Sequence, residues 1–105
     1  MKQVTVYKGR TVILPVALGI DVSQDTITSE IRAGKSRTET LIATWVVTYV
    51  TDGTDGDILL TLDNDITEAI TNSVGYMDLK RVSGGEPLSV FDEPLQVAFV
   101  NTVTA

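Results

Sequence analysis

The sequence predicts an all-β fold: an antiparallel β-sandwich of about seven to eight strands with one short helix. Three observations lead to this class: short runs in which apolar and polar residues alternate, turn residues between the runs, and one run with helical spacing. The chain has 105 residues, of which 43% are apolar, so it can bury one core but not two. Residues 1–105 are therefore predicted to form a single domain.

A β-hairpin over residues 40–63 is the clearest local prediction. The first arm, residues 41–50, alternates between two faces, and the second arm does the same after Gly56. Between the arms lies a stretch of Asp and Gly residues, which tolerate the positive φ that tight turns require. The apolar residues assigned to the inner face are Leu41, Ala43, Trp45, Val47, Tyr49, Ile58, Leu60 and Leu62.

Three strands are predicted before the hairpin, over residues 4–7, 11–18 and 26–33. Residues 8–10 form a turn between the first two, and residues 19–25 form a polar connection. Pro15 cannot donate to a hydrogen-bond ladder, so it is expected at a sheet edge or a bulge. The loop at residues 34–39 is the most basic patch of the chain.

A short helix and three further strands are predicted after the hairpin. The helix covers residues 64–72, where an Asp or Asn can cap the first turn. Its apolar residues Ile66, Ala69 and Ile70 are expected to plug the open end of the core. The strands are assigned to residues 74–82, 88–91 and 95–100, with a turn at 83–87 and a break at 92–94.

The predicted core consists of inward-facing apolar residues from most of these elements. Because the chain has no cysteine, no disulfide supports the fold, and this core must supply the stability. Its predicted members are Val12, Leu14, Val16, Ile27, Ile31, Leu41, Trp45, Val47, Ile58, Leu60, Leu62, Ile66, Ile70, Met77, Leu79, Val97 and Phe99.

The composition argues against several classes of function. The net charge of −6 repels phosphates and anionic headgroups, so neither nucleic acid nor a membrane is a predicted partner. There is no histidine or cysteine, which removes the usual catalytic triads and the common zinc sites. No apolar run reaches the ~20 residues that span a bilayer, and Pro15 with the alternation near the N-terminus indicates strands rather than a signal peptide. The prediction is a non-enzymatic protein without a cofactor or metal.

A cluster of aspartates in and after the hairpin turn allows two chemical alternatives, a carboxylate pair for glycoside hydrolysis and a calcium site. The spacing does not match an EF-hand loop, because Thr54 and Gly56 occupy alternate ligand positions after Asp52. The favoured interpretation is that the aspartates are turn and capping residues. Whether residues 52–57 bind Ca²⁺ stays open. The cluster comprises Asp52, Asp55, Asp57, Asp63 and Asp65.

Charged loops and turns are the predicted contacts with protein partners, since loops on a rigid sandwich are where such folds usually bind. The turn at residues 83–87 is a further candidate surface. A carbohydrate-binding module is the alternative from another class, and it requires two exposed, coplanar aromatic rings, for which Tyr49 and Tyr76 are the plausible pair. The predicted partner-contact residues are Arg32, Lys35, Arg37, Asp52, Asp55, Asp57, Lys80 and Arg81.

Several short motifs, taken in order, resemble those of a known group of proteins. They are Lys8-Gly9-Arg10-Thr11 before an apolar strand, an Asp-Gly turn followed by Ile58-Leu59-Leu60-Thr61-Leu62, the helical segment DITEAI, Gly75-Tyr76-Met77-Asp78-Leu79, and Val97-Ala98-Phe99. From about Tyr7 to Val100 the chain resembles the small immunoglobulin-like virion proteins of tailed bacteriophages, including the N-terminal domain of baseplate upper proteins.

The resemblance implies an immunoglobulin-like sandwich and a virion structural protein that acts by protein–protein contact. The implied position is the tail, the baseplate or the attachment of a fibre, with capsid decoration as the alternative. The implied partners are other virion proteins, and the chain would be present as a homo-oligomer or in many copies. Such a protein is assembled into the virion in the host cytoplasm.

Overall fold

The computed structural model describes residues 3–90 and 93–103, and these form nine strands and one helix. The break predicted at Asp92 and the strand end predicted at Phe91 lie outside the described residues. Among the described helical residues, none belong to a helix with the length and apolar character to cross a membrane. The elements are β1 (Gln3–Tyr7), β2 (Val12–Ala17), β3 (Thr26–Arg32), β4 (Leu41–Thr44), β5 (Val46–Tyr49), β6 (Asp57–Leu62), α1 (Asn64–Glu68), β7 (Val74–Ser83), β8 (Glu86–Ser89) and β9 (Leu95–Val100).

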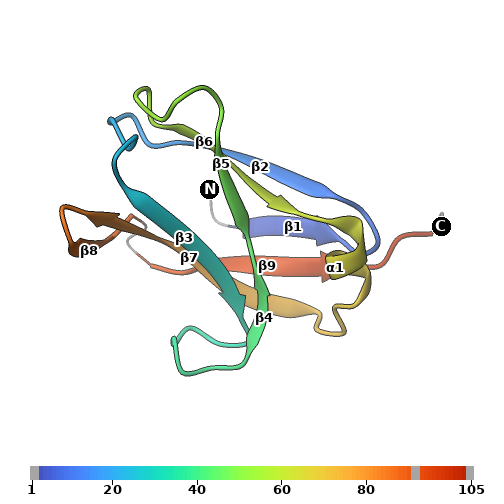
Figure 1. The fold of residues 1–105 in the computed structure, drawn as a ribbon. Coiled ribbons are helices and arrows are strands. Elements are labelled where there is room, and N and C mark those ends of the chain that lie inside the picture. Colours follow the sequence, from blue (N-terminus) through green and yellow to red (C-terminus); the bar gives the residue numbers. More distant parts are fainter. Residues whose placement is uncertain (1–2, 91–92, 104–105) are drawn as a thin grey trace.

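Two sheets form a β-sandwich (Figure 1), which confirms the predicted fold class with its single short helix. The larger sheet has the order β1-β9-β7-β3-β4, with β8 also paired to β7, and the smaller sheet has the order β2-β6-β5. The described strand pairs are antiparallel except β1 and β9, which run parallel. The turn at residues 8–10 carries the chain from one sheet to the other, so β1 and β2 take different partners.

The division of strands between the two sheets is that of an immunoglobulin-like domain. Strands β2, β6 and β5 take the places of strands B, E and D, while β3, β7 and β9 take those of C, F and G. Antibody domains join strands B and F by a disulfide beside a tryptophan on strand C. This chain has no cysteine, so no disulfide joins its sheets, and its tryptophan lies after β4.

The core lies between the sheets and holds most of the predicted residues. The predicted core residues that are buried are Ile27, Ile31, Trp45, Ile58, Leu60, Leu62, Ile70, Met77, Leu79, Val97 and Phe99. Those that are partly buried against them are Val12, Leu14, Val16 and Val47. Val4, Val6 and Val22, which were not among the predicted core residues, are also buried. Val4 and Val6 alternate on β1, and the pairing of β1 with β9 places them over the core.

The predicted first arm of the hairpin is two strands in different sheets. Strand β4 pairs with β3 in the larger sheet, whereas β5 pairs with β6 in the smaller one. Trp45 joins them: its side chain is buried and its amide donates to the carbonyl oxygen of Ser29 at 2.9 Å. The β5–β6 hairpin is confirmed, and the change of sheet at Trp45 accounts for a strand beyond the predicted number.

The prediction that Leu41 lies in the core is wrong, because its side chain is 46% exposed. The register between β3 and β4 shifts at Ile31 and Arg32: Ile31 faces Ala43, but Arg32 faces Leu41. Ile42 is therefore an extra residue in β4, and a bulge of this kind displaces the alternation of inward and outward side chains.

Helix α1 is shorter than predicted and presents a different face to the core. Ile66 is 39% exposed and Ala69 is also exposed, so both were wrongly predicted to plug the core, whereas Ile70 is buried as predicted. Thr67 takes the inward position three residues before Ile70. Its hydroxyl donates to the carbonyl oxygen of Arg10 at 2.8 Å, which explains how a polar side chain is buried there.

Candidate functional site

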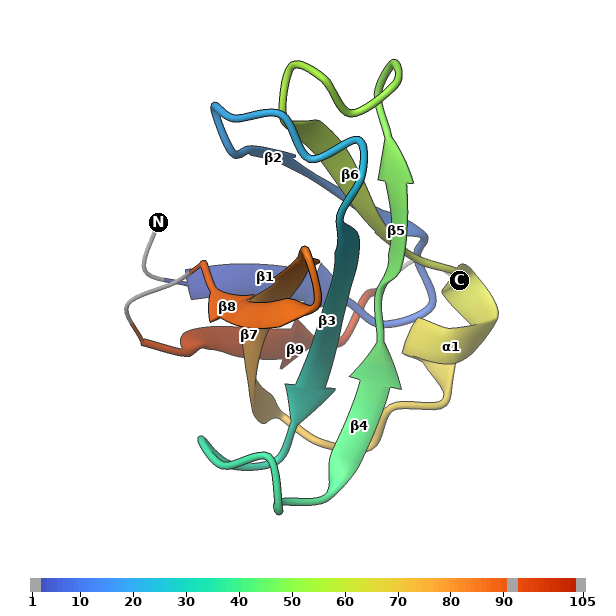
Figure 2. The ribbon, with the colours of Figure 1, turned by 60° about the vertical axis from the view of Figure 1, so that its left-hand side comes forward.

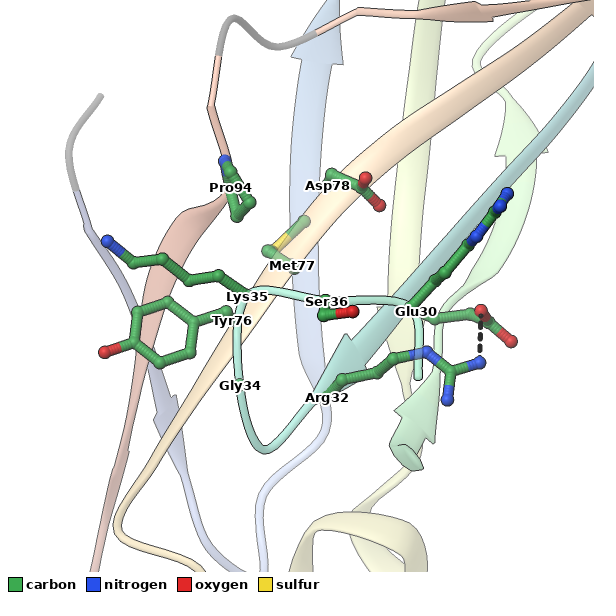
Figure 3. Close-up of a pocket in the computed structure, with 10 residues that line it drawn as sticks. Glu30, Arg32, Gly34, Lys35, Ser36, Tyr76, Met77, Asp78 and Pro94 are labelled. Atoms are coloured by element: carbon green, nitrogen blue, oxygen red, sulfur yellow. Dashed lines mark hydrogen bonds and ion pairs between the residues drawn. The ribbon is translucent and has the colours of Figure 1, made fainter. Parts of the chain in front are cut away.

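The predicted basic loop lies over the outer face of the larger sheet, between β3 and β4 (Figure 3). Strands β3 and β7 are neighbours, as the prediction for Lys80 required, and Glu30 lies opposite Asp78. The loop covers a hollow of about 70 Å³. That volume admits a few water molecules, but it is far below the roughly 300–1,000 Å³ of a typical ligand site. The charged and aromatic side chains at this face are Glu30, Arg32, Lys35, Arg37, Tyr76, Asp78 and Lys80.

Two of the predicted contact cations interact with groups of their own chain. Arg32 forms an ion pair with Glu30 at 3.0 Å and donates a second hydrogen bond to the carbonyl oxygen of Glu39 at 2.9 Å. The ammonium group of Lys35 lies 5.4 Å from the centre of the Tyr76 ring, a cation–π distance (Figure 3). Any partner at this face would therefore compete with contacts that already exist.

The remaining cations of this face, Arg37 and Lys80, lie beside carboxylates. Both line a shallow groove of about 450 Å³, together with Glu30 and Asp78. Strands β3 and β7 thus supply acidic side chains between the basic ones, and the face is mixed in charge. Taken by itself, the sequence of the loop is basic. Its acidic neighbours, Glu30 and Asp78, come from the paired strands β3 and β7.

Arg81 lies apart from the other predicted contact residues. Alternation along β7 places Lys80 on the outer face and Arg81 on the opposite one. The guanidinium of Arg81 forms an ion pair with Asp25, whose side chain is only 6% exposed. Arg81 therefore neutralises a buried carboxylate at the end of the sandwich.

Two aspartates of the hairpin tip, Asp52 and Asp55, each accept a backbone N–H of their own turn. The Asp52 carboxylate accepts hydrogen bonds from the hydroxyl of Thr54 at 2.6 Å and from its N–H at 3.0 Å. These bonds lower the pKa of Asp52 below its ordinary value. The Asp55 carboxylate accepts the N–H of Asp57 at 3.0 Å. Within residues 3–90 and 93–103 no three acidic side chains gather as metal ligands do, and the turn interpretation accounts for these contacts.

The tip packs against the connection between β2 and β3. The N–H of Val22 donates to the carbonyl oxygen of Gly53 at 2.8 Å. The N–H of Leu18 donates to the carbonyl oxygen of Gly56 at 2.9 Å. Gly56 has a φ of +79°, and a Cβ there would lie 2.4 Å from the carbonyl oxygen of Ile20. Only glycine fits this approach, so the tip is held as one unit with the neighbouring loop.

The two tyrosines that a sugar-binding platform would need do not lie on one face. Tyr49 is on β5 in the smaller sheet and Tyr76 is on β7 in the larger sheet. The Tyr49 ring is half-buried, and its hydroxyl donates a hydrogen bond to the carbonyl oxygen of Val22 at 2.9 Å. Its polar end is therefore engaged within the fold.

The outer face of the smaller sheet was not predicted as a site, yet it is the least polar surface that the sheets present. Across its three strands, Ile13 lies beside Thr61, which lies beside Val46, and the next row is Pro15, Leu59 and Thr48. Among the outward residues of β2, β5 and β6, Asp57 alone is charged. We call this surface the apolar face, and its members are Ile13, Pro15, Ala17, Val46, Thr48, Val50, Leu59 and Thr61.

A signal for this face was present in the sequence of β2. A strand with one wet face normally alternates apolar and polar residues. Residues 12–17 are apolar at the outward positions as well as at the inward ones. The outward residue Ile13 is 58% exposed.

A further groove of about 390 Å³ lies between β4 and α1, and Leu41, Ile42 and Ile70 contribute to its lining. Leu41, Ile66 and Ala69, which were wrongly assigned to the core, all border it. Figure 2 shows β4 and β5 following one another along the same side of the sandwich. Exposed apolar residues therefore continue along this side.

No protein-family model matches the chain, and neither does any curated protein sequence. Among solved structures, the chain is similar to one described by a photo-crosslinking study of multimeric cell-adhesive interactions of VGSC beta subunits. The two are 12% identical, the similarity covers 97% of this chain and 93% of that chain, and the TM-score is 0.42.

Proposed function

We propose that the chain is a structural protein of a tailed-bacteriophage virion and that it works by protein–protein contact, without catalysis. The apolar face is the observation that carries the contact function. Three of its side chains, Ile13, Val46 and Val50, are 58%, 56% and 54% exposed. Apolar groups gathered on one sheet surface are expected to be covered by a partner, because their removal from water is favourable.

The size of the apolar face indicates what kind of contact it makes. Strands about 4.8 Å apart with a rise of about 3.3 Å per residue give the face an area of about 300 Å². A stable interface buries about 800 Å² on each partner. The face by itself supports a weak contact, which gains strength when many copies bind together or when neighbouring surfaces join it.

The resemblance of the motifs to phage virion proteins supports the virion as the setting. A virion presents many identical copies to one another, and such multivalency suits a weak contact surface. The proposed position is the tail, the baseplate or the attachment of a fibre. Capsid decoration is the second position within the same class.

The arrangement of acidic residues supports a role without catalysis. Asp52, Asp55 and Asp57 lie at one end of β6, while Asp63 and Asp65 follow its other end. A strand of six residues spans about 20 Å, whereas the paired carboxylates of glycosidases lie about 5–9.5 Å apart. The aspartates are thus divided between the two ends of β6.

The test is incorporation into particles. Virions produced with a tagged copy of the chain are purified, and the chain is measured by mass spectrometry and located by immunogold labelling. Ile13→Asn makes the apolar face polar at an exposed site, and Thr28→Asn is the matched change on the outer face of β3. We expect the wild type and Thr28→Asn to be incorporated and Ile13→Asn to be lost. Particles without the chain, or equal incorporation of both variants, contradict the proposal.

A further inference from the structure

Strand β5 is a four-residue edge of the smaller sheet that contains neither a proline nor a charged residue. It pairs with β6 on one side, and no described strand pairs with its other side. Natural edge strands are normally protected by a proline, a charged residue or a bulge. The opposite edge, β2, carries Pro15 at its middle, and proline cannot donate to an added strand. Residues 40–51 contain no proline, glycine or charged residue.

The side chains at this open edge belong to the apolar face. Val46 and Val50 are 56% and 54% exposed, and Thr48 between them is also exposed. Figure 2 shows β5 at the side of the smaller sheet, beyond β6. A strand added beside β5 would hydrogen-bond to its unpaired edge and extend the apolar face at the same time.

We propose that β5 pairs antiparallel with β5 of a second copy of the chain, about a two-fold axis that passes through Thr48. The two smaller sheets then form one continuous sheet of six strands. This inference rests on the proposed function, because it names the partner of the same surface.

The sequence of β5 is self-complementary in this register. With Thr48 opposite its own copy, Val46 of each protomer lies opposite Val50 of the other. Pairs of β-branched residues and of threonines directly opposite one another stabilise antiparallel strands. A two-fold interface requires such self-matching, and it closes at a dimer without leaving an edge of β5 exposed.

The charge distribution also favours a second copy at this edge. Each chain carries a net charge of −6, so most surfaces of two copies repel one another. The charged residues nearest in sequence to β5 are Glu39 and Asp52. In the proposed register, residues 46–50 of the two copies pair with one another, and none of them is charged. The edge is thus a place where two acidic molecules can meet without opposed like charges.

The dimer is expected to be weak. Strand β5 has four residues, so the edge alone buries less than the roughly 1,000 Å² of a stable interface. The joined apolar faces measure about 600 Å² by strand spacing, and they form one surface for further partners. Self-association should therefore increase with protein concentration in solution.

The absence of cysteine allows a direct test by crosslinking. In the proposed dimer the two Thr48 residues are directly opposed, at a Cα separation of about 4.5–5.5 Å that a disulfide can bridge. Thr48→Cys in the full chain should form a disulfide-linked dimer under mild oxidation. Thr5→Cys, an exposed position on the open edge β1, is the matched control. We expect the Thr48→Cys variant to crosslink about tenfold faster, because pairing raises the local thiol concentration.

A second measurement uses sedimentation velocity over a range of protein concentrations. Val46→Lys places a charge on the open edge and should weaken self-association about tenfold. Val100→Lys, at a 40% exposed position on β9, makes the same change of net charge elsewhere and should leave self-association as in the wild type. Far-UV circular dichroism of both variants confirms that they remain folded.

The outcomes separate this inference from the proposed function. Equal crosslinking of the Thr48→Cys and Thr5→Cys variants, or equal association of Val46→Lys and Val100→Lys, overturns the β5 dimer. If Ile13→Asn still prevents incorporation in that case, the contact function stands with another partner. If the β5 dimer forms but virions contain no copy of the chain, the virion function falls and the dimer stands.

Discussion

The two outer faces of the sandwich differ in how their exposed side chains are satisfied. On the larger sheet, Arg32 is paired with Glu30, and Lys35 lies against Tyr76. On the smaller sheet, apolar side chains such as Ile13 and Val46 are more than half exposed. Charged groups on the larger sheet already have partners or water. Covering the exposed apolar side chains of the smaller sheet, in contrast, lowers the free energy.

A charged loop is therefore a weaker indicator of a contact surface than a strand whose outward positions carry apolar residues. The basic loop stands out in the sequence, yet folding brings Glu30 and Asp78 beside its cations. The apolar face has no motif, and it appears only when the outward positions of β2, β5 and β6 are placed side by side.

Removing the side chain that joins the two sheets should have the largest effect. Trp45 is buried where the chain passes from the larger sheet to the smaller one. Trp45→Ala should lower the free energy of unfolding by about 3–5 kcal/mol through lost burial and a cavity. Because Trp45 is the one tryptophan of the chain, unfolding in urea is followed by circular dichroism. A loss below about 1 kcal/mol would show that contacts other than those of Trp45 hold the two sheets together.

Trp45→Phe is the matched control for this change. The indole N–H of Trp45 is buried without a hydrogen-bond partner among the described residues. Phenylalanine keeps an aromatic ring and removes this unsatisfied donor. The variant should therefore lose less than about 1.5 kcal/mol.

The two ion pairs should differ in their contribution to stability because they differ in burial. Arg81→Met leaves the Asp25 carboxylate, 6% exposed, without its cation, and should cost about 2–3 kcal/mol. Arg32→Met breaks a pair whose side chains are 24% and 44% exposed, and should cost less than about 1 kcal/mol. Urea unfolding of both variants at neutral pH measures the difference. Equal losses would mean that burial does not distinguish the pairs.

The hairpin tip and the neighbouring connection between β2 and β3 should both contribute to the loss of stability in acid. Hydrogen bonds from Thr54 lower the pKa of Asp52 from 3.8, and those from Ser23 lower the pKa of Asp21 from 3.8. A carboxyl whose pKa is lower in the folded chain stabilises it above the unfolded pKa, and this contribution is lost as the pH falls through the folded pKa.

Replacing these two carboxyls tests the sign of the effect. The double variant Asp21→Asn, Asp52→Asn keeps acceptor oxygens in both turns but cannot titrate. Its free energy of unfolding should therefore fall less steeply than that of the wild type between about pH 4 and about pH 2. Urea unfolding at several pH values checks this, and parallel curves for the two proteins would contradict it.

The smallest effect is expected from the cations of the larger sheet. Arg37 and Lys80 are exposed beside Glu30 and Asp78. The double variant Arg37→Gln, Lys80→Gln should change the free energy of unfolding by less than about 0.5 kcal/mol. Its incorporation into virions should equal that of the wild type. If incorporation is lost while the chain stays folded, the contact lies on the larger sheet, as the sequence first indicated.

Much of the local structure was predictable because its causes are local. Alternation located the strands, and the inward assignments of Ile58, Leu60 and Leu62 are confirmed. Pro15 was expected at an edge and lies on β2, an edge strand. Asp52 and Asp55 of the hairpin tip bind their own turn, as the favoured interpretation held.

The candidate site was less predictable. The predicted contact residues are all charged, and only Arg32, Lys35, Arg37 and Lys80 among them share one face. Arg81 lies on the opposite side of its strand with Asp25. Which side chains meet depends on how strands distant in sequence pair, for example on the register of β3 with β7. No local sequence pattern encodes that register.

Most of the strands and turns and the burial of Trp45 were predictable from the sequence, because side-chain alternation and turn conformation depend on neighbouring residues. The tertiary structure decided which sheet each strand joined. It placed β1 parallel to β9, moved the chain between sheets at Trp45, and displaced Leu41 outward through the bulge in β4. It also set Ile13, Leu59 and Val46 on one face from three strands. Strand pairing joins residues that are far apart in the chain, so only the folded structure reveals the apolar face.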